Sequence, residues 1–134
     1  MGNRISGSRP VNPDESVDSH MSLTVLVVDD EQAVRQMLVD VLLEEGYTTL
    51  TAENGADAIE VATARRPDLV LSDVMMPGLD GVTLAAVFAR WDPPVPVVLM
   101  SAIFGPRSDG TPVLPKPFDL DDMLAVVAAT MDAA

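Results

Sequence analysis

Short runs of β-branched and other apolar residues alternate along the chain with segments that repeat apolar residues at helical spacing. A run that is apolar at successive positions indicates a strand buried on both faces, as in a parallel sheet. We therefore expect strands over residues 24–28, 47–52, 69–72, 95–100 and 113–114. Apolar residues recurring every three or four positions predict helices around residues 34–42, 56–64, 84–88 and 120–127.

Polar residues and a glycine mark where two of these helices begin and end. Asp30 precedes the first helix and Asp119 precedes the last, and aspartate is a favourable N-cap residue. Gly46 follows the first helix as a stop signal. Because strands that alternate with helices are joined by right-handed crossovers, the pattern predicts an α/β domain in which helices cover both faces of a five-stranded parallel sheet.

Length and local composition favour one globular domain that follows a separate leader. A chain of 134 residues has room for one hydrophobic core. Residues 1–20 are rich in Ser, Gly, Pro and Asn and show no periodicity, so we interpret them as a disordered leader, an expression tag joined to a native start at Met21. The predicted domain is residues 21–134. The single histidine, His20, falls in this leader.

Charge and composition exclude several classes of function. With 21 acidic and 8 basic residues the net charge is −13, so most of the surface would repel a nucleic acid and we expect no direct binding to one. No apolar run approaches the ~18 residues of a membrane span, so no membrane insertion is expected. The lack of cysteine excludes disulfide and thiolate chemistry and agrees with a cytoplasmic location.

Polar residues gather at the carboxyl ends of the predicted strands, where ligands bind in folds of this class. They are Asp29, Asp30, Asp73, Ser101 and Lys116. Three carboxylates held close together repel one another, and a hard cation such as Mg²⁺, which prefers oxygen ligands, would relieve this repulsion. Asp73 could then attack phosphorus as a nucleophile, while Lys116 and Ser101 bind the phosphoryl oxygens that the metal leaves free.

Four motifs in this order resemble the receiver domain of two-component response regulators. They are residues 27–31 (VVDDE), 72–81 (SDVMMPGLDG), 100–102 (MSA) and 116–118 (KPF). The resemblance covers residue 23 to about residue 131. It implies a CheY-like, flavodoxin-like doubly wound fold with strand order 2-1-3-4-5.

The resemblance also implies roles for the residues at the strand ends. Asp73 would be the phosphoacceptor, with Ser101 as the switch hydroxyl and Lys116 as the phosphate-binding lysine. Mg²⁺ would be held by Asp29, Asp30, Asp73 and the backbone carbonyl of Met75. In many relatives the peptide bond corresponding to Lys116–Pro117 is cis.

Partners follow from the same resemblance. The implied phosphodonor is a sensor histidine kinase or a histidine phosphotransfer protein, and the downstream target is unknown. We expect a cytoplasmic monomer or phosphorylation-dependent dimer that acts as a phosphoacceptor rather than as a turnover enzyme. Met75 and Ile103 are apolar at positions where relatives often place groups that orient hydrolytic water, so autodephosphorylation is expected to be slow.

The segment between Ser101 and Lys116 departs from the family pattern. It is several residues shorter than is typical, by roughly two helical turns, and Gly and Pro oppose a helix there. We therefore expect the fourth helix to be shortened or absent. Relatives carry a switch aromatic where this chain has Val113. We therefore expect the output to be transmitted through another surface or through a loop that orders on phosphorylation.

Each of these residues also has a purely structural interpretation. Asp30 could be only a helix cap, Asp73 a turn residue, Ser101 a loop hydroxyl and Lys116 a solvated charge. If all of these held, the chain would be a phosphorylation-independent interaction module with a receiver fold. A Mg²⁺-dependent phosphatase is a further alternative, although its nucleophile would follow the first strand in an Asp-x-Asp pattern, whereas this chain reads Asp29-Asp30-Glu31.

Overall fold

The computed structural model describes residues 23–103, 105, 107 and 109–133. The predicted leader, residues 1–20, lies outside the described residues. Within these residues nine elements follow one another: β2 (Thr24–Val28), α1 (Gln32–Glu44), β3 (Thr48–Ala52), α2 (Gly55–Ala64), β4 (Leu69–Asp73), α3 (Gly81–Ala89), β5 (Val97–Ser101), β6 (Val113–Pro115) and α4 (Leu120–Ala133).

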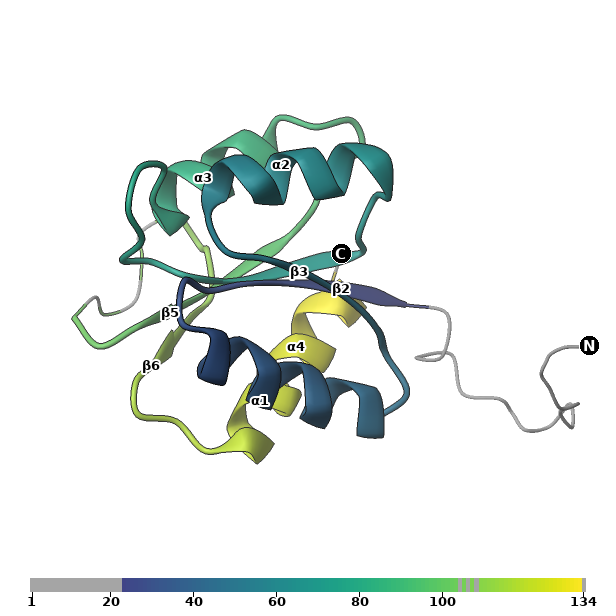
Figure 1. The fold of residues 1–134 in the computed structure, drawn as a ribbon, viewed down its shortest axis with the longest axis vertical. Helices are drawn as coiled ribbons and strands as arrows, with labels where there is room; N and C mark the ends of the chain where they lie inside the picture. Colours follow the sequence, from purple (N-terminus) through teal and green to yellow (C-terminus); the bar gives the residue numbers. More distant parts are fainter. Residues whose placement is uncertain (1–22, 104, 106, 108, 134) are drawn as a thin grey trace, which may run out of the picture.

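The five described strands form one parallel sheet in the order β3-β2-β4-β5-β6. Numbered along the chain, this order is 2-1-3-4-5, so the predicted doubly wound, flavodoxin-like fold is confirmed. Helices α1 and α4 cover one face of the sheet, and α2 and α3 cover the other (Figure 1). Among the described residues, no helix is long and apolar enough to cross a membrane.

The core is divided by the sheet into two clusters, because successive strand residues point to opposite faces. In β2, Val25 and Val27 pack with α1 and α4, while Leu26 and Val28 pack with α2 and α3. All four of these side chains are fully buried. This two-sided burial explains why the strand is apolar at every one of these positions.

Strands β3 and β5 begin later than predicted because helix ends use the N–H groups that would have started them. The N–H of Tyr47 donates to the carbonyl of Leu42 in α1, and the N–H of Val95 donates to the carbonyl of Phe88 in α3, each at 3.1 Å. Gly46, with φ of 96°, makes the turn that ends α1. The predicted stop at Gly46 is therefore confirmed, whereas Tyr47 belongs to the helix end rather than to the strand.

The prediction that Asp30 caps α1 is wrong. The N-cap of α1 is Glu31, and its side chain makes no capping hydrogen bond. Asp30 instead remains exposed at the end of β2. The predicted cap of the last helix holds, since the carboxylate of Asp119 accepts from the N–H of Asp122 at 2.9 Å.

No helix is present among the described residues between β5 and β6, as the Gly and Pro content of this segment predicted. The next described element is β6, which forms an edge of the sheet. Pro112 precedes this strand and Pro115 is its last residue. Val113 is half-buried and packs against the cluster under α2 and α3. Val113 therefore contributes to the core beneath these two helices.

Candidate functional site at the carboxyl ends of the strands

The polar residues singled out in the sequence lie together at one edge of the sheet. Asp29 and Asp30 follow β2, whereas Asp73 and Ser101 are the last residues of β4 and β5. Lys116 directly follows β6. The strands thus extend one residue further than predicted at β4 and β5, and their hydrogen-bonded ladder fixes the backbone of both site residues.

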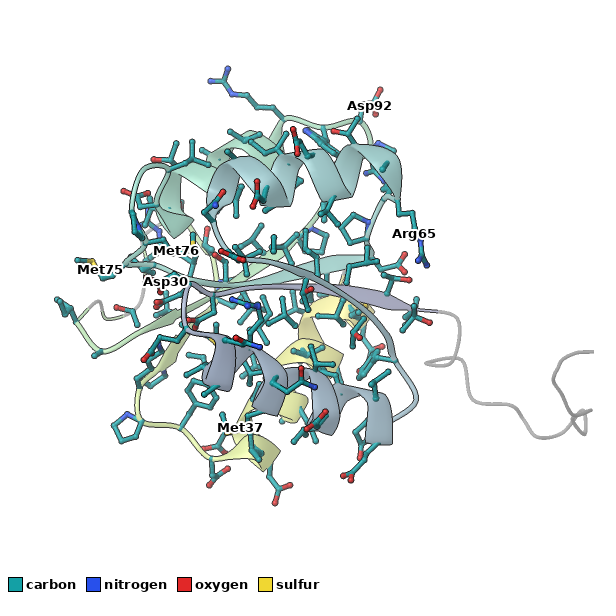
Figure 2. The ribbon with its side chains drawn as sticks, viewed as in Figure 1. Asp30, Met37, Arg65, Met75, Met76 and Asp92 are labelled. Atoms are coloured by element: carbon teal, nitrogen blue, oxygen red, sulfur yellow. The ribbon has the colours of Figure 1, made fainter. Side chains whose placement is uncertain are left out.

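Three carboxylates form a compact cluster at this edge. One carboxylate oxygen from each of Asp29, Asp30 and Asp73 lies within 4.8 Å of the others. Asp29 is fully buried and Asp73 is 8% exposed, whereas Asp30 is exposed. In Figure 2, Asp30 lies at the same edge of the molecule as Met75 and Met76, which belong to the loop after β4. The cluster is therefore closed on the sheet side and open on the loop side.

Neighbouring residues form hydrogen bonds with every polar group of Asp29 except one carboxylate oxygen. Its N–H donates to the carbonyl of Ala52 at 3.2 Å, and its Oδ1 accepts from the N–H of Glu31 at 2.9 Å. Its carbonyl accepts from Nη1 of Arg35 at 2.6 Å. Oδ2 is buried and accepts no hydrogen bond from the described residues. An unsatisfied buried carboxylate oxygen beside two further carboxylates is the arrangement that a hard divalent cation fits.

Burial raises the pKa of the Asp29 carboxyl above its usual value. The negative charges of Asp73 and Asp30 raise this pKa further. The hydrogen bond from Glu31 and the positive charge of Lys116 act in the opposite direction but do not cancel the effect of burial. The electrostatics of the cluster thus favour the uptake of positive charge, either as a proton or as a cation.

Lys116 brings a positive charge to the edge of this cluster. Its Nζ lies 3.3 Å from Oδ1 of Asp73 and 4.0 Å from Oδ2 of Asp29. The backbone of Lys116 is anchored by its N–H, which donates to the carbonyl of Ser101 at 2.8 Å, and its peptide bond to Pro117 is cis. The side chain is 28% exposed, so the ammonium can be reached from solvent.

Two further predicted site residues are Ser101, at the end of β5, and Met75, in the loop after β4. The hydroxyl oxygen of Ser101 accepts from the N–H of Ile103 at 3.0 Å. Met75 follows Asp73 by two positions, and its side chain is 62% exposed while that of Met76 is buried. The role expected for the Met75 carbonyl concerns a bound ion and remains a prediction.

Sequence reasoning missed three residues that shape the site. Besides Arg35, the hydroxyl of Ser72 donates to the carbonyl of Asp73 at 2.9 Å. At Gly81, an added Cβ would lie 2.3 Å from that same carbonyl, so only glycine fits there. Gly81 was visible as part of the motif after Asp73, but nothing in the sequence pattern pointed to Arg35, because an arginine in the first turn of an amphipathic helix normally faces solvent.

An open cleft of about 420 Å³ adjoins the carboxylate cluster. Its lining includes Asp30 and Glu53 on one side and Pro77 and Leu79 on the other. The cleft gives an incoming group access to this edge of the sheet. Chemically, the site combines carboxylates, whose oxygens are ligands of the kind that divalent cations prefer, with an ammonium that can bind an anionic group.

Comparison with known proteins agrees with this geometry. Residues 25–128 match the family model described as response regulator receiver domain. The chain is 37% identical over 110 residues to the DNA-binding transcriptional regulator NtrC of Escherichia coli K12, covering 77% of this chain and 24% of that protein. It is 36% identical over 118 residues to the response regulator MprA of Mycobacterium ulcerans, covering 83% of this chain and 51% of that protein. The chain thus spans a quarter to a half of these curated relatives.

Solved structures show the same likeness. The chemotaxis response regulator CheY4 of Vibrio cholerae superposes with a TM-score of 0.73 at 27% identity, covering 81% of this chain and 98% of that chain. The receiver domain of the hybrid histidine kinase CckA gives a TM-score of 0.71 at 34% identity, with the same coverage. Matching family model, sequence relatives and fold lead to one conclusion: the chain belongs to the response regulator receiver domain family.

Proposed function

We propose that Asp73 accepts a phosphoryl group from a phosphohistidine, with Mg²⁺ bound beside it, and that its phosphorylation switches an interaction with a partner protein. The family membership supports the coarser part of this proposal, phosphoacceptor signalling in a two-component system. The observation that carries the finer part is the position of Asp73, whose carboxylate lies 3.3 Å from the Lys116 ammonium and within 4.8 Å of the carboxylates of Asp29 and Asp30.

In the proposed transfer, a carboxylate oxygen of Asp73 attacks phosphorus and forms a new P–O bond. The bond from phosphorus to the imidazole nitrogen of the donor breaks, and its electron pair stays on that nitrogen. Lys116 then binds a phosphoryl oxygen through its ammonium, and the hydroxyl of Ser101 donates to another. Mg²⁺, held by Asp29, Asp30, Asp73 and the Met75 carbonyl, would neutralise negative charge on the phosphoryl group.

The proposed donor is a sensor histidine kinase or a histidine phosphotransfer protein, and the downstream target is a further protein. A receiver domain of a hybrid histidine kinase is among the similar structures, which supports a donor of this kind. Because no helix is found in the described part of the segment between β5 and β6, we propose that phosphorylation acts on the output by ordering this loop. The chain would act as a phosphoacceptor, without repeated turnover.

Intact mass spectrometry tests the proposal. The protein is incubated with Mg²⁺ and acetyl phosphate, and a gain of one phosphoryl group is expected for the wild type and for Asp80→Asn. Asp80 is a matched control because it is also an aspartate of the loop after β4, but its carboxylate caps α3. Asp73→Asn should show no gain.

The other outcomes identify the alternatives. If the wild type gains no phosphoryl group, the phosphorylation-independent interaction module is favoured. If the donor is consumed over many turnovers, the chain is a phosphatase. A gain that persists in Asp73→Asn would overturn the assignment of the phosphoacceptor.

A further inference from the structure

Arg35 links the first turn of α1 back to the end of β2. Its Nη1 donates to the carbonyl of Asp29 at 2.6 Å, and its own N–H donates to the carbonyl of Glu31 at 3.0 Å. The side chain is half-buried. The short loop between β2 and α1 is thereby closed from the helix side as well as from the strand side.

The hydrogen bond from Arg35 matters because it leaves only one polar atom of Asp29 without a hydrogen-bond partner among the described residues. The N–H, the carbonyl and Oδ1 of this residue are all engaged, and only Oδ2 lacks a hydrogen bond from the described residues. Holding the carbonyl prevents rotation of the peptide that follows Asp29. The orientation of the Asp29 carboxylate, one oxygen of which lies within 4.8 Å of oxygens of Asp30 and Asp73, is then set by the fold before any ligand arrives.

We propose that Arg35 is a positioning residue for the divalent cation of this site, acting through the backbone of Asp29. The inference rests on the proposed function, because it concerns the ion used in that phosphotransfer. It assigns a role to a residue that has no place among the expected ligands or phosphate-binding groups. Partners that orient a metal ligand commonly change metal affinity about 10–100-fold when they are removed.

Two effects of the Arg35 guanidinium on a cation oppose each other. Its hydrogen bond orients a ligand and strengthens binding, whereas its positive charge repels the cation and weakens binding. The charge is delocalised over the guanidinium and the side chain is only half-buried, so solvent screens the repulsion. Orientation of the buried Asp29 has no such screening, and we therefore expect it to dominate.

The experiment is isothermal titration calorimetry of the full chain with Mg²⁺ alone, without a phosphodonor. For Arg35→Met, which keeps the aliphatic part of the side chain and loses the donor, the Kd should rise about tenfold. Arg35→Lys, which retains a donor and the charge, should restore part of the affinity. Arg65→Met is the matched control, because Arg65 is exposed and lies at the opposite end of the molecule from Asp30 (Figure 2).

Each outcome has a definite meaning. An unchanged Kd in Arg35→Met would overturn the proposal, and a lower Kd would overturn it in favour of charge repulsion. If Arg35→Met does not fold, as judged by circular dichroism, Arg35→Gln takes its place with the same expected direction. If the wild type binds no Mg²⁺, the proposed function itself fails. If the wild type binds and all variants bind equally, only the role of Arg35 fails.

Discussion

Oδ2 of Asp29 lies 4.0 Å from Nζ of Lys116, which allows charge attraction but is too long for a hydrogen bond. The same ammonium lies closer to Asp73, at 3.3 Å, so two carboxylates share one cation. The desolvation of the Asp29 carboxylate is therefore compensated only in part. We therefore expect the site to destabilise the folded domain when no metal ion is bound.

Replacing Asp29 with Asn should stabilise the metal-free domain at neutral pH. The pKa of Asp29 is raised in the folded state, so the folded domain binds more protons than the unfolded chain, and stability falls as pH rises from 3.8 through the raised pKa. Asn keeps the Oδ1 acceptor and removes the charge. We expect the free energy of unfolding of Asp29→Asn to exceed that of the wild type, measured by urea unfolding at neutral pH with a chelator present.

If Mg²⁺ binds as proposed, it should raise the Tm of the wild type, and Asp29→Asn should lose this increase. Asp80→Asn is the control, because hydrogen bonds from Thr83 lower the pKa of Asp80 and its contribution to stability is therefore present at neutral pH and lost only in acid. That variant should gain no stability at neutral pH. If Asp29→Asn proved less stable than the wild type in chelator, the buried Asp29 charge would not be a source of instability.

Much of the fold and of the candidate site could be predicted from the sequence, and the features that could not be predicted share a cause. The β-branched runs located the strands well enough to place Asp29, Asp30, Asp73, Ser101 and Lys116 at one edge, because strand ends in parallel sheets share an edge. The roles of these residues remain predictions. The contact of Arg35 with Asp29 was not predicted, and Tyr47 was assigned to a strand, because both depend on the direction of a side chain or of an N–H group. Periodicity gives the face of an element and leaves that direction open.

Adding a methyl group at Gly81 should damage phosphorylation as well as stability. A Cβ there would lie 2.3 Å from the carbonyl oxygen of Asp73 and 2.9 Å from Cα of Val74. Both are backbone atoms, which cannot move away without distorting the chain. We expect Gly81→Ala to lower the free energy of unfolding by about 1–3 kcal/mol and to slow phosphorylation of Asp73.

Gly78 provides the comparison for this prediction. Its φ is +77° and a Cβ would meet nothing within 4 Å, so Gly78→Ala carries only backbone strain, about 1 kcal/mol. Urea unfolding and the rate of mass gain with acetyl phosphate measure both variants. Equal phosphorylation rates in the two variants would show that the contact with Asp73 is unimportant.

The phosphorylated domain should keep its phosphoryl group for longer than a variant that can orient water. Met75 and Ile103 are 62% and 71% exposed beside the site, and neither can hydrogen-bond a water molecule well. We expect Met75→Asn to shorten the half-life of phosphorylated Asp73 several-fold. The decay is measured by intact mass spectrometry after the phosphodonor is removed. Met37→Asn, at an exposed methionine on α1, should leave the half-life unchanged.

A separate contact fastens the loops at the other end of the sheet. Arg66 lies over the ring of Trp91, with Cζ 5.5 Å from the ring centroid, and its Nη2 donates to the carbonyl of Pro93. We expect Arg66→Met to lower the free energy of unfolding by about 1 kcal/mol and to shift the emission of Trp91. Arg65→Met should do neither, and phosphorylation should be unaffected in both. A slower phosphorylation in Arg66→Met would indicate coupling between the two ends.

The prolines around β6 have a consequence for how this domain meets copies of itself. β6 forms one edge of the sheet, and an uncovered edge strand can recruit the strand of another molecule and so start aggregation. Pro115 has no N–H to offer such a strand, Pro112 directs its carbonyl to the N–H of Leu99 in β5 rather than outward, and β6 is only three residues long. This edge is thereby protected by its own sequence, so the sheet can end there although the described residues between β5 and β6 form no helix.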